Sequence, residues 1–122
     1  MADRLALYRR DFHAMGSPCE IQLYAKSRPR AQHVLNRLTS EIQRLEARYS
    51  RYRDDSFLKT INRVAAVGGA ITVDDETAGL LNYVATCYLE SGGLFDVTSG
   101  LLRKAWSFKE KRLPLELSLI HI

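Results

Sequence analysis

The sequence has few residues of the kinds that build metal frameworks or hydrolytic sites. Its only cysteines, Cys19 and Cys87, form no Cys-x-x-Cys pair and cannot supply the closely spaced ligands of a structural zinc site. We interpret both as buried thiols, because free cysteine behaves as a small hydrophobic residue. The three histidines, His13, His33 and His121, share no ligand spacing, and no Ser, His and Asp set or phosphate-binding P-loop is visible. A nucleophilic hydrolase is therefore disfavoured.

Long apolar runs are also missing. No stretch approaches the roughly 18 apolar residues of a membrane span. The N-terminus lacks the apolar core, roughly 7 to 15 residues long, that a secretory signal needs. From this sequence, the chain is expected to be cytoplasmic. An upstream segment carrying an export signal would instead make it periplasmic or membrane-anchored.

What the chain does contain is the mix of a soluble globular domain, with 46% hydrophobic and 26% charged residues. Its length is sufficient to bury a core without disulfides. Lysine and arginine number 18 against 14 aspartate and glutamate, which gives a net charge of +4. This mild excess favours anionic ligands without identifying one, so nucleotides, nucleic acids and acidic proteins remain open.

The first half of the chain predicts one strand and two helices. Turn residues at 15–18 precede an alternating run at 19–24, which is typical of a half-buried strand. Apolar residues at helical spacing predict a long amphipathic helix over residues 29–49. A second helix is expected to begin at Asp55 or Ser56, either of which can accept hydrogen bonds from free helix amides, and to stop at Gly68.

The second half of the chain predicts a further strand, a third helix, a short extended piece and a last helix. Residues 70–73 are β-branched and bounded by turn residues, which predicts a strand, and the acidic residues 74–76 suit the positive end of a third helix. That helix ends at residues 91–93, residues 94–97 are interpreted as a short extended piece, and Thr98 or Ser99 is expected to cap a last helix carrying Trp106. The expected fold class is α/β (α+β), with amphipathic helices packed on a small sheet.

Three stretches stand out for their chemistry, each with a structural alternative. Residues 91–100 place glycines and small hydroxyl residues around one carboxylate, which suits either a ligand cradle or a glycine-terminated helix followed by a capped turn. Residues 49–56 alternate aromatic rings with guanidinium groups, which suits stacking on a planar ring and pairing with phosphate, or a solvated helix end. The thioether of Met15 beside a glycine suits an aromatic ligand or core filling.

Acidic pairs offer a further alternative. Asp54 and Asp55, and the acidic residues 74–76, have oxygen ligands that suit Mg²⁺, but carboxylates at helix starts are the commoner explanation.

Taken in order, these stretches resemble the N-terminal part of the ApbE-type FAD:protein FMN transferases. The resembling pieces are Phe-His-Ala-Met-Gly-Ser-Pro at 12–18, Tyr-Ser-Arg-Tyr at 49–52 leading to Ser-Phe-Leu at 56–58 and Ile-Asn at 61–62, and Ser-Gly-Gly-Leu-Phe-Asp-Val-Thr at 91–98, followed by Trp106. The resemblance runs from about residue 12 to residue 108. Three separated motifs in the right order are far more specific than any one of them.

The resemblance implies a Mg²⁺-dependent transferase that binds FAD and moves its FMN part to a Thr or Ser hydroxyl of an acceptor flavoprotein, such as a subunit of a redox-driven ion pump, releasing AMP. Carried over by position, the residues expected to contact FAD are Met15, Tyr52, Gly93, Leu94, Phe95 and Asp96. We expect these three places in the sequence to converge on one wall of a pocket for the flat cofactor.

The chain departs from the family pattern in two respects. Ser17 stands where threonine is more usual, which keeps the hydroxyl. The resemblance also implies that the metal ligands lie in a C-terminal portion absent here, so we expect the chain alone to be inactive. Residues 1–112 are accordingly expected to be the N-terminal part of a flavin transferase domain, incomplete by itself, and residues 113–122 a tail of doubtful origin.

Two other functions stay open at this level. A small basic nucleic-acid-binding module would use the guanidinium groups of Arg44, Arg48, Arg51 and Arg53, with the rings of Tyr49 and Tyr52 stacking on bases. The acidic residues that interrupt this series argue against such a module. A structural fragment without a ligand of its own is the third alternative.

Overall fold

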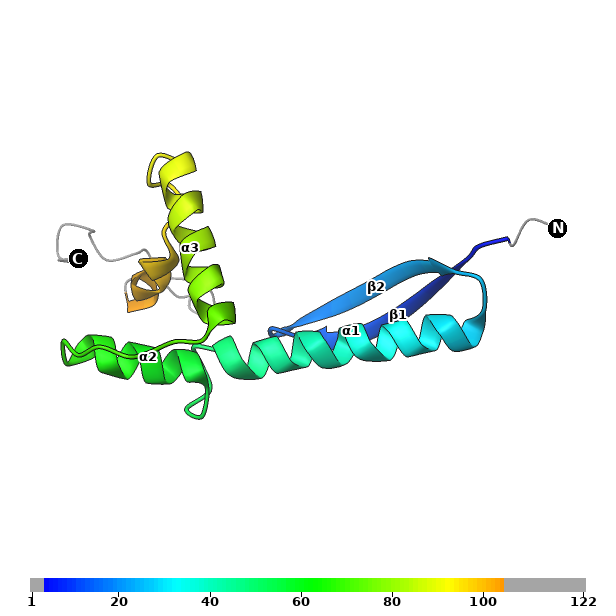
Figure 1. Cartoon of the computed structure of the whole chain (residues 1–122), viewed down its shortest axis with the longest axis horizontal. Coiled ribbons are helices and arrows are strands. Elements are labelled where there is room, and N and C mark those ends of the chain that lie inside the picture. The colour runs from blue at the N-terminus through cyan, green and yellow to red at the C-terminus, as the bar shows by residue number, and fades with distance from the viewer. Residues whose placement is uncertain (1–3, 105–122) are drawn as a thin grey trace. The chain divides into compact units, whose positions relative to one another are not determined.

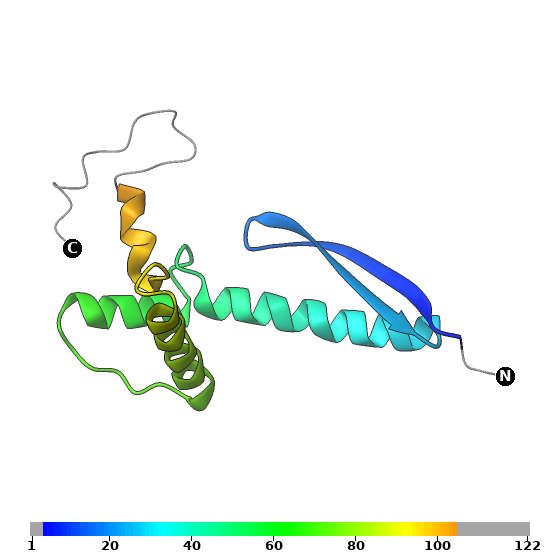
Figure 2. The ribbon, with the colours of Figure 1, turned by 90° about the horizontal axis from the view of Figure 1, so that it is seen from above.

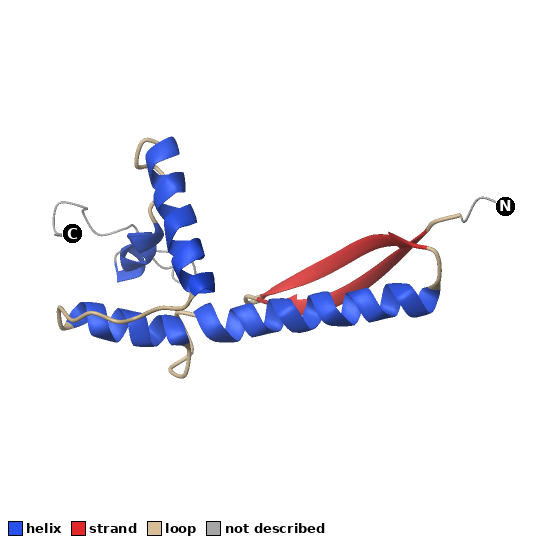
Figure 3. Ribbon diagram, in the orientation of Figure 1, coloured by secondary structure: helices blue, strands red, loops and turns tan. Residues whose placement is uncertain are grey.

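The computed structural model describes residues 4–104 of the chain, which divides into two compact units. Unit 1 is Met1–Ile71 and unit 2 is Thr72–Ile122. The elements in chain order, coloured by type in Figure 3, are β1 (Ala6–Ala14), β2 (Ser17–Ala25), α1 (Arg28–Tyr49), α2 (Phe57–Ala66), α3 (Asp75–Glu90) and the 3-10 helix η1 (Val97–Lys104). Among the residues described, no helix combines the length and the apolar character needed to cross a membrane.

Unit 1 is built on a β-hairpin with a long helix along it. Strands β1 and β2 pair antiparallel, so that Ala6 lies opposite Ala25 and Ala14 lies opposite Ser17. Helix α1 runs beside both strands in the two views of Figures 1 and 2 and contacts each of them. Ala14 at the end of β1 is buried, as are two α1 side chains, Ala31 and Leu35. The expected fold class, α/β (α+β) with helices on a small sheet, is confirmed.

Helix α1 confirms the prediction for residues 29–49. It begins one residue earlier, at Arg28, with Pro29 in its first turn, where the missing N–H of proline costs no intrahelical bond. The Arg44 guanidinium donates to both carboxylate oxygens of Glu41, at 2.9 and 2.7 Å, on the solvated face. The helix ends where Ser50 takes extended backbone angles.

Helices α2 and α3 begin at side-chain caps. The Ser56 hydroxyl accepts a hydrogen bond from the N–H of Lys59 at 3.1 Å, which identifies it as the cap of α2. An Asp74 carboxylate oxygen accepts from the N–H of Thr77 at 3.2 Å at the start of α3. For Asp74, the helix-start interpretation is therefore confirmed.

Strand β1 was not among the predicted elements. The residues on its more covered face are not all apolar, because Arg10 lies between Tyr8 and Phe12 and breaks the alternation of apolar and polar residues. The Arg10 guanidinium donates to the side-chain oxygen of Asn36 on α1, so this polar position is satisfied by a tertiary contact. The partner strand β2 is longer than predicted, because it also includes Ser17 and Pro18.

Three other predictions were wrong. Residues 70–73 form no strand, because β-branched composition alone does not supply a pairing partner. Residues 94–97 are not an extended piece, because residues 94 and 95 are bends and Val97 already begins η1. Thr98 and Ser99 lie inside η1, which begins at Val97, so neither caps it. Trp106 lies outside the described residues, as does the tail predicted at 113–122.

The two cysteines are less buried than expected. Cys19 on β2 and Cys87 on α3 are both free thiols with intermediate exposure, because no residue of β2 is fully buried and only Thr77 of α3 is.

Candidate functional site

The tip of the hairpin is a two-residue turn formed by Met15 and Gly16. Both residues have positive φ angles, 54° and 70° respectively. Positive φ at both central positions is the signature of a type I′ turn, whose twist matches that of the flanking antiparallel strands. Glycine adopts this conformation readily, whereas methionine adopts it only under constraint.

Met15 is held by its backbone and presents its side chain to solvent. Its N–H donates to the Oε1 atom of Glu46 on α1 at 2.8 Å. Its side chain is 70% exposed. The structure therefore excludes core filling for Met15 among the described residues and leaves its thioether available to a ligand.

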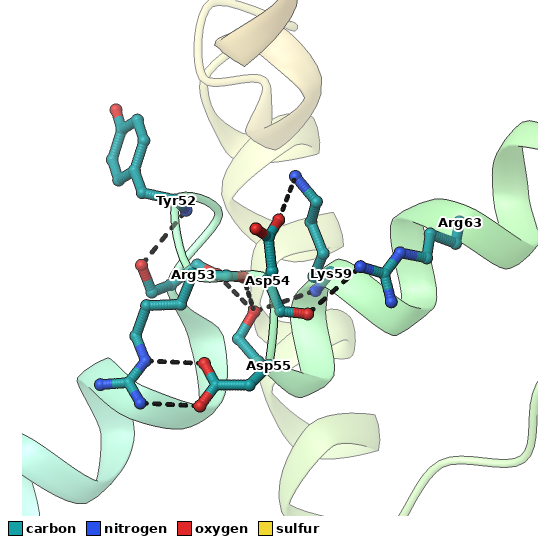
Figure 4. A network of polar contacts seen from close by, with 8 residues as sticks. Tyr52, Arg53, Asp54, Asp55, Lys59 and Arg63 are labelled. Carbon is teal, nitrogen blue, oxygen red and sulfur yellow. Dashed lines mark hydrogen bonds and ion pairs between the residues drawn. The ribbon is translucent and has the colours of Figure 1, made fainter.

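Residues 50–56 form the loop between α1 and α2, and Ser56 organises it. This side chain is only 1% exposed. Its hydroxyl donates toward the carbonyl oxygens of Ser50 and Arg53, the second at 3.2 Å, and accepts from Lys59. One buried hydroxyl thus joins the end of α1, the middle of the loop and the start of α2 (Figure 4).

Tyr52 lies in this loop and is directed outward. Its N–H donates to the Ser50 hydroxyl oxygen at 3.2 Å, while its ring, 70% exposed, points away from the ionic groups of the loop in Figure 4. The guanidinium carbon of Arg51 lies 5.8 Å from the centre of the ring, within the range of a cation–π contact. A planar ring and a positive charge therefore stand next to each other at this loop.

The remaining charges of the loop are paired, either within the loop or with a residue of α2. The Arg53 guanidinium donates to both oxygens of Asp55, at 3.0 and 2.9 Å. Arg53 lowers the pKa of Asp55 through this hydrogen bond and through its positive charge. The same hydrogen bond, together with the negative charges of Asp55 and Glu46, raises the pKa of Arg53. The carboxylate of Asp54 lies 3.5 Å from the ammonium of Lys59. Asp55 thus forms an ion pair within the loop, and Asp54 forms one with α2.

In unit 2, the segment that follows α3 turns sharply at Gly92 and Gly93, with φ angles of 62° and 83°. A side chain at position 93 would lie 3.3 Å from the phenol oxygen of Tyr88, so a substituent there would crowd the ring. The Ser91 hydroxyl accepts from the N–H of Phe95 at 2.8 Å and donates to the carbonyl of Tyr88 at 3.1 Å. Leu94, at the outside of the turn, is 93% exposed.

Asp96 is fixed by Thr98, which donates both its N–H and its hydroxyl to one carboxylate oxygen, at 2.8 and 2.7 Å. These two bonds lower the pKa of Asp96 below its ordinary range, and the bond from the hydroxyl has the larger effect. At neutral pH the group is therefore an ionised acceptor at the start of η1. Beside it lies a groove of about 420 Å³ lined by Leu81, Val84, Ala85, Tyr88, Leu89, Asp96 and Val97.

The six predicted site residues belong to two sets, one in each unit. Met15 and Tyr52 both belong to unit 1, and Glu46, which bonds Met15, lies in the last turn of α1, shortly before the loop of Tyr52. Residues 93–96 form one turn in unit 2. The contact of these six residues with FAD stays a prediction.

The supporting roles of Glu46 and Thr98 are not predicted by the sequence pattern. Nothing in the pattern pairs Glu46 with Met15, because the two are 31 residues apart in the sequence. The Asp-x-Thr spacing at 96–98 was a usable signal, since aspartate side chains commonly bond the backbone two residues later.

Metal binding by these residues finds no support. Within residues 4–104, no three His, Cys, Asp or Glu side chains come together as a metal site. The acidic residues 54–55 form ion pairs instead, and Asp74 of the acidic residues 74–76 forms a helix cap.

The comparison with known sequences agrees with the resemblance described above. Residues 15–119 match the sequence profile of the ApbE family. No curated protein sequence matches the chain. The family match covers most of the 122 residues and includes every predicted site residue from Met15 to Asp96. The chain belongs to the ApbE family.

Proposed function

We propose that this chain binds FAD as a substrate and forms part of a flavin transferase, which moves FMN to a Thr or Ser hydroxyl of an acceptor flavoprotein. A subunit of a redox-driven ion pump would be one such acceptor. The observation that carries this proposal is the ApbE family match over residues 15–119, which includes all six candidate FAD contacts.

The geometry of unit 1 supports a flat ligand. Met15 and Tyr52 each leave 70% of the side chain exposed, while their backbone N–H groups are held by Glu46 and Ser50. A polarizable thioether and a phenol ring both pack well on planar heterocycles. The guanidinium of Arg51, next to the Tyr52 ring, adds a positive charge that suits a pyrophosphate.

Unit 2, taken by itself, also carries polar groups that suit FAD. Asp96, kept ionised by Thr98, accepts hydrogen bonds from N–H or O–H donors of FAD. The glycine turn at 92–93 bends the chain sharply just before Asp96. These groups bind and orient the substrate, which is the larger part of the protein's work in phosphoryl transfer.

In the proposed reaction, the acceptor hydroxyl oxygen forms a bond to the phosphorus of the FMN half. The bond from that phosphorus to the bridging oxygen of the pyrophosphate breaks, AMP leaves with the electron pair, and the hydroxyl loses its proton. Magnesium dependence enters the proposal from the family resemblance alone. Within residues 4–104, no set of side chains fits a Mg²⁺ ion.

The nucleic-acid-binding alternative is disfavoured by the pairing of its residues. Arg44 is bonded to Glu41 and Arg53 to Asp55. The Arg48 guanidinium lies 4.7 Å from the centre of the Phe57 ring. Arginines engaged in this way are poorly placed to neutralise a series of phosphates.

The test is an FAD titration of the purified chain, followed by quenching of flavin fluorescence. Tyr52→Ala should weaken FAD binding by about tenfold, which is the size of one lost stacking contact. The control is Tyr83→Ala, which removes another tyrosine that is 69% exposed, on α3. FAD affinity equal in the two variants, or no binding by the wild-type chain, would contradict the proposal.

FMN transfer is a separate measurement. We expect the 122-residue chain to bind FAD without transferring FMN in the presence of Mg²⁺ and an acceptor, because residues 4–104 offer no metal site. Flavin attached covalently to the acceptor, detected by fluorescence in a denaturing gel, would show that the chain is competent by itself.

A further inference from the structure

Glu46 connects the end of α1 to the tip of the hairpin. One of its carboxylate oxygens accepts the N–H of Met15 at 2.8 Å, across 31 residues of sequence. The Glu46 side chain has intermediate exposure and the bond itself is exposed, but an ionised carboxylate makes a stronger hydrogen bond than a neutral acceptor. Its charge also acts on Arg53, in the loop that carries Tyr52.

The residue held in this way has an unusual backbone. Met15 has a φ angle of 54° and is the only residue other than glycine with a positive φ among those described. A side chain in the left-handed region is unfavourable and persists where the surroundings hold it. The hydrogen bond to Glu46 is such a restraint, because it joins the turn to a rigid helix and not to another loop.

We propose that Glu46 is a positioning residue, whose carboxylate holds the backbone of Met15 and so sets the direction of its exposed thioether. The purpose of this arrangement, to place the thioether against FAD, rests on the proposed function. The anchor itself does not depend on it. The two parts are therefore tested by separate measurements on the full chain.

The first measurement needs no ligand. Hydrogen exchange of the Met15 amide, followed by NMR, should be about tenfold faster or more in Glu46→Ala, because the amide loses its acceptor. Glu46→Gln keeps an oxygen acceptor and should restore most of the protection. Glu41→Ala is the control, since it removes a carboxylate from the same helix, one that bonds Arg44. An unchanged exchange rate in Glu46→Ala would overturn the anchor.

The second measurement is a double-mutant cycle on FAD affinity. Glu46→Ala should weaken FAD binding several-fold in the wild-type chain and have no further effect in Met15→Gly, which has no thioether to direct. A general loss of structure at Glu46 would instead weaken FAD binding equally in both backgrounds, and that result would overturn the positioning role.

The outcomes separate the two proposals. If the wild-type chain binds no FAD, the proposed function fails and the purpose assigned to Glu46 fails with it, while the exchange experiment still decides whether the anchor exists. If FAD binds and the cycle shows additive effects, the proposed function stands and Glu46 is only structural.

Discussion

At the scale of single residues, the hairpin turn depends on glycine at position 16 through its backbone angle alone. Nothing lies within 4 Å of where a Cβ would be, but φ is +70°. Gly16→Ala should therefore lower the free energy of unfolding by about 1 to 2 kcal/mol, measured by urea denaturation followed by circular dichroism.

Substitution of a second glycine, Gly79, should change the free energy of unfolding in the opposite direction. Gly79 lies inside α3 and also has open space around its Cβ position, without a positive φ. Gly79→Ala should stabilise the chain by about 0.5 to 1 kcal/mol, because alanine loses less backbone entropy in a helix. Destabilisation by both substitutions would show that the difference in φ is not the cause.

Asp96 gives a prediction about pH. Its folded pKa is lowered, so its contribution to stability is complete above its ordinary pKa of about 3.9 and is lost as the pH falls through the lowered value. Thr98→Val removes the hydroxyl donor but keeps the N–H donor, and should raise the pKa of Asp96 part of the way back. Thr98→Ser should leave the pKa low. The measurement is an NMR titration of the carboxyl carbon, and equal pKa values in both variants would contradict the role of the hydroxyl.

At the scale of elements, the helices could be predicted because their signals are local. Pro29 and the helical spacing indicate α1, and the side-chain caps Ser56 and Asp74 mark the starts of α2 and α3. Each signal lies within a few residues of the structure that it specifies. Such signals can therefore be recognised without knowledge of the tertiary fold.

Strand β1 and the site anchors could not be predicted in the same way. The Arg10 side chain on β1 donates to Asn36 on α1, and the N–H of Met15 donates to Glu46. Both partners are distant in sequence. Residues 70–73 show the converse, since local β-propensity without a partner strand gave a wrong prediction. The site residues themselves came from the family resemblance, and what holds them came only from the structure.

The loop between α1 and α2 gives the prediction at this scale. Ser56→Ala should lower the free energy of unfolding by about 1 to 2 kcal/mol, because it removes the cap of α2 and leaves the carbonyls of Ser50 and Arg53 without their hydroxyl donor. Ser40→Ala, an exposed serine within α1, is the control and should change stability by less than about 0.5 kcal/mol. A similar small change in Ser56→Ala, measured by thermal denaturation, would show that the loop does not depend on this hydroxyl.

At the scale of the whole molecule, the net charge of +4 predicts only weak, salt-dependent attraction to nucleic acids. At about 0.15 M salt, where the screening length is about 8 Å, a labelled single strand should bind weakly and should not displace FAD. Fluorescence anisotropy over a range of salt concentrations measures both. Displacement of FAD by the oligonucleotide would favour the basic module over the transferase.

The two-stranded sheet carries a consequence for the behaviour of the chain in concentrated solution. Within residues 4–104, neither strand has a second neighbour, so both outer edges offer backbone groups to another copy. Arg9 and Asp11 on β1, and Pro18 and Glu20 on β2, are residues of the kinds that discourage such pairing. Salt screens the charged ones, so added salt should promote aggregation, and low ionic strength should keep the protein monomeric.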